Sequence, residues 1–163
     1  MKLLIPSAKE LNEQARIVEP QPLSENTKTI LQALKAFSLE ELATFYGISE
    51  ERALVEKERI EALLAGSAKT YPALELFDGL MYRSIERQGL SEKEQAYLQE
   101  HLLITTALYG VLPAYEGIAP HRLDFMMKLK PAGKSLKAFW KEDYDQAVEG
   151  EEQILSLLSS EFE

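Results

Sequence analysis

The clearest structural signal in the sequence is the run Leu102-Leu103-Ile104-Thr105-Thr106-Ala107-Leu108. It is continuously apolar or β-branched, which is typical of a strand buried on both faces of a sheet. Ser91 and Glu94, just before it, have the spacing of a capping box, which predicts a helix that extends to about His101. A helix leading directly into a buried strand favours an α/β fold.

Further strands and helices are predicted on either side of this run. Residues 3–5 form a short apolar stretch that indicates a first strand. Residues 73–77, which lead into the turn signal Asp78-Gly79, predict another strand. Alternating apolar and polar residues between 123 and 130 are typical of a half-exposed strand. Residues 136–147 have helical spacing, and residues 154–158 predict a last, buried strand. The whole indicates a mixed sheet with flanking helices.

Three serines, at positions 24, 38 and 49, stand where helix caps are expected and predict three helices within residues 24–66. The segment 39–53 resembles a helix-turn-helix. Its second helix would meet DNA, yet it carries a row of acidic residues that DNA would repel. An αα-hairpin packed on the sheet is therefore the favoured interpretation. The acidic residues are Glu50, Glu51, Glu56, Glu58 and Glu61.

Length and composition indicate one domain, residues 1–163, in the cytoplasm. There is no cysteine, and no apolar run approaches the ~20 residues of a membrane span. The predicted last strand is apolar, yet the chain ends five residues after it. We therefore expect a fold incomplete at its C-terminal end, with an exposed apolar patch beside that strand.

The charge is unevenly distributed along the chain. The net charge is −9, which by itself argues against a nucleic-acid partner. Residues 142–163, however, hold eight acidic residues and no Lys or Arg, whereas residues 110–141 hold six basic residues against two acidic ones, a local charge of +4. One surface of the protein can therefore be basic although the chain is acidic.

Candidate chemical sites are few. His101 and His121 lack the spacing of metal ligands, so we expect no metal site, and no cofactor motif is present. Tyr109-Gly110 follows the buried strand, where α/β proteins bind ligands, but a core tyrosine beside a turn glycine fits equally well. Lys134 follows Gly133 before a predicted helix, where a phosphate can bind, although a solvated turn is favoured. Trp140 lies on an apolar helix face and is expected to pack in the core.

Several sequence blocks together resemble the YaaA family of peroxide-stress proteins, formerly DUF328. The strongest are Leu108-Tyr109-Gly110-Val111-Leu112-Pro113 and Pro120-His121-Arg122-Leu123-Asp124. Gly133-Lys134-Ser135-Leu136 follows, with Phe139-Trp140. Weaker similarity lies at 5–9, at Phe77-Asp78-Gly79 with Tyr82, and at 157–162. Family members continue beyond the length of this chain.

The resemblance implies a cytoplasmic α/β protein of YaaA-like fold that lowers free iron during peroxide stress. It also implies shape-directed binding of duplex and branched DNA in a positively charged cleft, with no cofactor and no established enzymatic activity. The positions carried over are Lys9, Tyr82, Tyr109, Arg122, Lys134 and Trp140, followed by Ser159 and Glu161. Lys9, Arg122 and Lys134 would meet phosphates, the last two converging on one anion, and Tyr82 or Tyr109 would stack on a base.

Two other functions remain open from the sequence. One is an enzyme with an α/β pocket for a nucleotide or another phosphate-bearing small molecule. The other is an acidic protein-interaction module that uses residues 40–61. The shape of the site separates the first of these from DNA binding: a long open basic groove favours DNA, and a closed pocket of a few hundred Å³ favours a small ligand.

Overall fold

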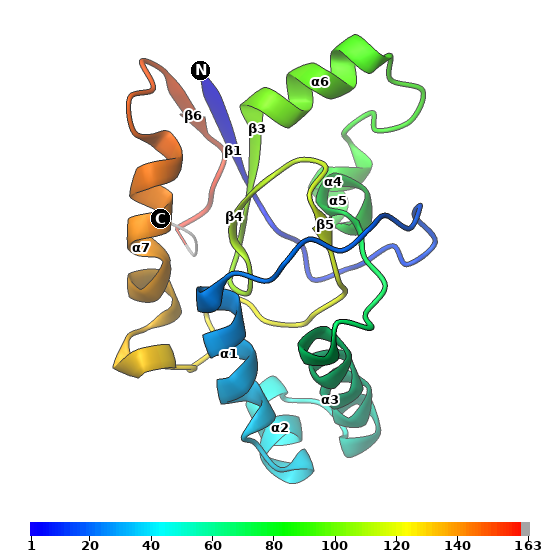
Figure 1. Ribbon diagram of the computed structural model, residues 1–163, viewed down its shortest axis with the longest axis vertical. Helices are drawn as coiled ribbons and strands as arrows, with labels where there is room; N and C mark the ends of the chain where they lie inside the picture. The colour runs from blue at the N-terminus through cyan, green and yellow to red at the C-terminus, as the bar shows by residue number, and fades with distance from the viewer. Residues whose placement is uncertain (161–163) are drawn as a thin grey trace.

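A four-stranded mixed sheet lies at the centre of the computed structural model, which describes residues 1–160 (Figure 1). Its strand order is β4-β3-β1-β6. The first strand, β1 (Lys2–Pro6), is parallel to both of its neighbours, β3 (Leu102–Thr106) and β6 (Ile154–Ser156). The fourth strand, β4 (Gly110–Pro113), runs antiparallel to β3. The predicted α/β fold with a mixed sheet is confirmed.

The structure confirms the predicted burial of β3 and contradicts that of β6. β3 is buried along its whole length, as its composition predicts. β6 pairs with β1 in the same sheet, also as predicted, but the expectation that it is buried is wrong: Ile154 is 46% and Leu155 50% exposed. The reason is position, because β6 is an edge strand among the described residues and apolar composition alone does not cover its faces. The expected exposed apolar patch is therefore present, with Leu157 continuing it.

The three serine-capped helices form a block beyond the carboxyl end of β1 (Figure 1). They are α1 (Glu25–Lys35), α2 (Leu39–Tyr46) and α3 (Glu50–Ala65). Each serine side chain accepts a hydrogen bond from a backbone N–H of the first turn, which confirms the predicted starts. α2 and α3 do form an αα-hairpin. It packs on α1 and on the segment after β3, rather than on a sheet face, because its apolar residues face those elements.

Short elements and two longer helices complete the fold. Tyr71–Pro72 (β2) pairs with Gly117–Ile118 (β5) in a second small sheet. α6 (Glu92–His101) begins at the predicted capping box and leads into β3. The single turn η1 (Pro131–Gly133) lies two residues before the start of α7, a helix of 13 residues. α7 (Leu136–Val148) covers one side of the main sheet, and the short helices α4 (Ala73–Leu76) and α5 (Leu80–Arg83) lie on the other (Figure 1).

The strand predicted at 73–77 is wrong, because residues 73–76 form the helical turn α4. Ala, Leu and Glu are strong helix formers, and Pro72 stands just before the first turn, where proline is well tolerated. The N–H groups of Ala73 and Leu74 donate to the carbonyl oxygens of Glu116 and Ala114 at 2.9 and 2.8 Å. A short buried apolar run does not reveal by its period whether it is helix or strand.

The strand predicted between 123 and 130 is also wrong. These residues form a loop with a turn at Asp124, whose carboxylate accepts a hydrogen bond from the N–H of Met126 at 2.9 Å. The alternation that suggested a strand is real, because Leu123, Phe125 and Leu129 are buried. Their side chains anchor the loop to the core, and no neighbouring strand in the described chain pairs with it.

Trp140 is 1% exposed, and its indole N–H donates to the carbonyl oxygen of Ala107 at 2.8 Å, which confirms the predicted core position. Its ring lies against Gly110, the first residue of β4. Gly110 has φ +76°, and a Cβ built there would lie 2.7 Å from Cε3 and Cζ3 of Trp140. Only glycine satisfies both the backbone conformation and this contact. The pair fixes α7 on the sheet. Within residues 1–160, none of the helices has the length and apolar character needed to cross a membrane.

Candidate functional site

A pocket of about 250 Å³ lies at the carboxyl end of β1. Three segments build it: the four residues from Pro6 to Lys9, the last residue of α2, and the loop that begins at His121. Ligands of open α/β sheets bind at the carboxyl ends of strands, so this position is the one that the fold itself favours. The lining residues are Pro6, Ser7, Ala8, Lys9, Tyr46, His121, Arg122, Leu123, Asp124 and Met127.

The floor of the pocket is set by the way in which β1 ends. β1 ends at Pro6, which has no N–H to donate, and the N–H of Ser7 makes one further bond to β3 by donating to the carbonyl oxygen of Thr105 at 3.1 Å. The carbonyl oxygen of Pro6 accepts a hydrogen bond from the Tyr82 hydroxyl at 2.7 Å. Tyr82 is 1% exposed, and burial raises the pKa of its hydroxyl. It therefore remains a neutral donor that fixes the turn from β1 into the pocket.

His121 presents a defined tautomer. Its Nδ1 lies 2.9 Å from the carbonyl oxygen of Ala119, and because a carbonyl oxygen can only accept, Nδ1 carries the hydrogen. The ring packs edge-on against Tyr109, with ring centroids 5.3 Å apart. Burial lowers the pKa of His121 to about 4, against the opposing effect of the bond to Ala119. At neutral pH the ring is uncharged, and Nε2 is a hydrogen-bond acceptor.

Two cations and one carboxylate stand at the rim of the pocket. The Lys9 side chain is 82% exposed and its Nζ lies 3.5 Å from Oδ2 of Asp124. Arg122 is exposed and forms no ion pair within residues 1–160. The rim therefore carries a net positive charge, with one cation partly neutralised and the other available to an anion.

Behind the pocket lies a buried carboxylate. Glu56 of α3 is 5% exposed, and Arg59 donates to it at 2.8 Å while also contacting Glu13 at 3.0 Å. Burial raises the pKa of Glu56, against the opposing charges of Arg59 and Arg122. Burial and the charge of Glu56 also raise the pKa of Tyr46, which stays neutral. The prediction that Glu56 faces outward with the acidic row of α3 is thus wrong: it points inward, where Arg59 compensates its charge.

A comparison with known protein families identifies the family of this chain. The family described as peroxide stress protein YaaA matches residues 1–163. The chain belongs to the YaaA family. Relatives named UPF0246 protein are 58% identical in Streptococcus gordonii and Streptococcus sanguinis and 55% identical in Streptococcus pneumoniae serotype 19F. Each match covers all 163 residues of this chain and 67% of the relative.

The YaaA-like positions predicted from the sequence separate into three groups. Lys9 and Arg122 meet at the pocket rim. Tyr82 and Tyr109 support the site from within: the hydroxyl of Tyr109 accepts a hydrogen bond from the N–H of Ala119 at 3.0 Å and burial raises its pKa to about 12. Lys134 is exposed just before α7 and is not among the residues that line the pocket with Arg122.

Of the less secure positions, Ser159 is exposed beyond β6, and Glu161 lies outside the described residues. The sequence did not single out Tyr46 or Met127 as site residues, and it considered His121 only as a metal ligand. His121 and Met127 share one signal, the turn chemistry of the loop that begins at Pro120-His121, which the strand-like alternation obscured. Tyr46 had no signal of its own, because it reaches the pocket only through the packing of α2.

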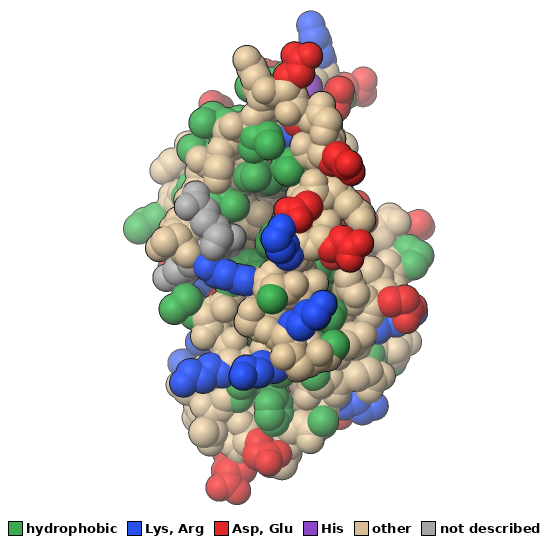
Figure 2. All heavy atoms as spheres, turned by 90° about the vertical axis from the view of Figure 1, so that its left-hand side faces the viewer, with side chains coloured by type: hydrophobic (Ala, Val, Ile, Leu, Met, Phe, Trp, Pro, Cys, Tyr) green, Lys and Arg blue, Asp and Glu red, His purple; other side chains and the backbone are tan. Residues whose placement is uncertain are grey.

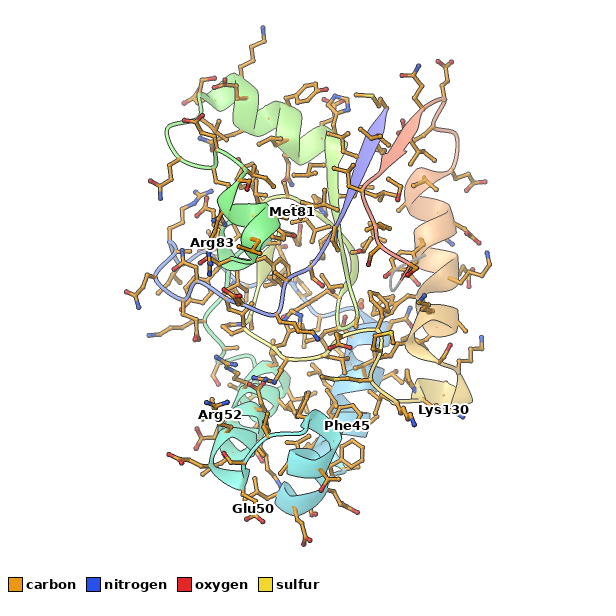
Figure 3. All side chains as sticks on the ribbon, turned by 180° about the vertical axis from the view of Figure 1, so that it is seen from behind. Phe45, Glu50, Arg52, Met81, Arg83 and Lys130 are labelled. Atoms are coloured by element: carbon orange, nitrogen blue, oxygen red, sulfur yellow. The ribbon has the colours of Figure 1, made fainter. Side chains whose placement is uncertain are left out.

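A basic surface extends from the pocket side toward α7. Lys and Arg side chains gather across the middle of the face that Figure 2 shows, with acidic side chains above and below. Figure 3 places Lys130 on the loop below α7, well away from Glu50 and Arg52 at the start of α3. Lys128, Lys130 and Lys134 are exposed, whereas Lys141 is paired with Asp145. These three exposed lysines belong to the segment of local charge +4.

Proposed function

We propose that this member of the YaaA family limits peroxide damage by binding DNA and restraining iron-dependent oxidation there. The observation that supports the proposal is the group of exposed cations on the loop before α7 together with Arg122. These side chains, Arg122, Lys128, Lys130 and Lys134, are exposed and form no ion pair within residues 1–160. Cations that form no salt bridge can bind phosphate oxygens without first losing one.

Such binding is directed by shape and phosphate position rather than by base sequence. Lysines that extend from an exposed loop reach the DNA backbone, which carries no sequence information. The acidic residues of α3 also limit the orientation of a duplex. Glu50 and Glu58 are exposed on the helical block, so DNA would be repelled there and attracted toward α7.

The test is binding of duplex and branched DNA across a salt series by the chain, by Arg122→Ala, by Lys134→Ala and by the double variant. Each lost phosphate contact should lower the slope of log affinity against log salt by about one, equally for all sequences. Lys93→Ala on α6, an exposed lysine at the opposite end of the sheet, is the matched control. An unchanged slope and affinity in the double variant would refute the proposal for these residues. A full-length streptococcal relative measured in parallel shows how much its additional third contributes.

A second function is favoured by one specific observation, the volume of the pocket. A cavity of about 250 Å³ with cations at its rim fits a phosphate-bearing small molecule and is too small for a duplex. Competition by free nucleotides at fixed ionic strength separates this function from DNA binding along the lysine surface.

A further inference from the structure

The pocket has two chemically different ends. Its rim carries Lys9 and Arg122, whose charges are exposed to solvent. Deeper in the pocket lies His121, held by the hydrogen bond to Ala119 and by its contact with Tyr109. A ligand that satisfies both ends must have an anionic group and, a few bonds away, a group that donates a hydrogen bond.

The walls between these ends are mostly apolar. Pro6, Leu123 and Met127 line them, and Tyr46 contributes an aromatic ring. A nucleobase is flat, has apolar faces and carries N–H donors on its edge, and aromatic side chains stack on bases of any kind. A volume of about 250 Å³ admits one such group and excludes a paired duplex.

We propose that this pocket receives a single unstacked nucleotide, with its phosphate between Lys9 and Arg122 and an N–H group of its base donating to Nε2 of His121. The inference rests on the proposed DNA-binding function when the nucleotide belongs to a strand, and it stands alone when the nucleotide is free. Unpaired nucleotides occur at bulges, junctions and strand ends, so the pocket gives preference to such DNA over a continuous duplex.

His121 is fitted to this role because its hydrogen-bonding direction is fixed. Nδ1 donates to Ala119, so only Nε2 is left for a ligand, and as an acceptor it selects a donor. A protonated histidine would instead attract a second anion. The neutral ring therefore distinguishes the base end of the ligand from its phosphate end.

Asp124 opposes the ligand's phosphate. Its carboxylate lies 3.5 Å from Nζ of Lys9, so it competes with a bound phosphate for that cation. Removing its charge should therefore strengthen anion binding. Asp124→Asn retains Oδ1, which accepts the N–H of Met126, so the turn is preserved while the charge is lost.

The experiment uses three probes: a labelled, covalently closed circular duplex with every base paired, the same duplex with one unpaired nucleotide, and a free deoxynucleoside monophosphate competing against inorganic phosphate. We expect the unpaired nucleotide to increase affinity about tenfold, and the free nucleotide to compete better than phosphate. His121→Asn, which can still donate to Ala119 but lacks Nε2, should lose this preference and leave binding to the closed duplex unchanged.

Asp124→Asn keeps the proposal testable if His121→Asn fails to fold. It should bind the free nucleotide about two- to fivefold more tightly, the gain expected from releasing one exposed ion pair. Asp145→Asn, which removes the partner of Lys141 on α7, is the matched control and should leave nucleotide affinity unchanged.

The outcomes separate this inference from the proposed function. Salt-dependent binding of both duplexes with equal affinity, and no competition by the nucleotide beyond that of phosphate, would overturn the pocket assignment and leave DNA binding intact. Nucleotide binding that depends on His121, without any DNA binding, would support the pocket and refute the proposed function. Binding of no probe would refute both.

Discussion

Gly110 and the indole of Trp140 are in such close contact that their coupling can be measured by a double-mutant cycle. Gly110→Ala places a methyl group 2.7 Å from two ring carbons of Trp140 and forces an L-residue into a backbone conformation with φ +76°. Trp140→Ala removes a buried ring and its hydrogen bond to Ala107. If the clash with the indole is the main reason why Gly110→Ala is destabilising, Trp140→Ala removes that clash.

The expected magnitudes follow from these contacts. The left-handed backbone costs about 1–2 kcal/mol and the overpacking a further ~1–3, so Gly110→Ala should lower the free energy of unfolding by about 2–5 kcal/mol. Trp140→Ala should lower it by about 3–5 kcal/mol. In the double variant only the backbone cost of the Gly110→Ala substitution adds to the loss of the indole, so the total should be about 4–7 kcal/mol. The two single costs thus exceed the double cost by about 1–3 kcal/mol.

Urea unfolding of the four proteins, followed by circular dichroism because tryptophan is lost in two of them, measures each free energy. Thermal melting is an independent check, at about 2–4 °C for each kcal/mol in a chain of this size. Strict additivity would show that Gly110→Ala acts only through its backbone and that the indole moves aside freely. It would refute the conclusion that this contact fixes α7 on the sheet.

Three further predictions concern groups buried without full compensation. The hydroxyl of Tyr144 is buried and has no hydrogen-bond partner within the described chain, so Tyr144→Phe should leave the urea midpoint unchanged or raise it, and a marked fall would reveal a partner. Burial raises the pKa of Glu56, so the fold loses stability as the pH rises above the unfolded pKa and this side chain ionises. Glu56→Gln cannot ionise and should therefore unfold at no lower urea concentration than the parent at pH 7. Unfolding at a lower concentration would show that the ion pair with Arg59 outweighs desolvation. Burial lowers the pKa of His121 to about 4, so the fold should lose stability as the pH falls from about 6.5 toward 4, where the unfolded histidine binds a proton and the folded one does not. His121→Asn should show a shallower decline over that range, and parallel pH profiles would assign the decline to other groups.

The sequence predicts well those elements that are determined locally. Ser24, Ser38 and Ser49 begin their helices because a cap needs only its own first turn. β3 is recognisable because a strand buried on both faces consists of apolar and β-branched residues alone. Family resemblance adds Lys9 and Arg122, which the structure brings to one pocket although more than 100 residues separate them.

The errors arise where distant partners decide the structure. The helical turn at 73–76 begins where the carbonyl oxygens of Glu116 and Ala114 accept the N–H groups of its first two residues, and no local pattern shows these distant acceptors. The loop at 123–130 alternates in burial because it is anchored to the core, which gives it the period of a strand without a pairing partner. β6 is exposed because of its place at the sheet edge. Glu56 can point inward because the guanidinium of Arg59 forms an ion pair with its carboxylate.

The central position of β1 has a consequence for synthesis on the ribosome. Leu3 pairs with Leu102, and Lys2 with Ile154, so β1 must wait for about 100 and then about 150 further residues before either neighbour exists. At about 5–20 residues per second, that interval lasts from several seconds to about half a minute. The helices between residues 25 and 65 need only local contacts and can form during it. A largely apolar strand is thus left unpaired beside a preformed helical block until β3 emerges, and this is the interval in which the nascent chain is most exposed to aggregation.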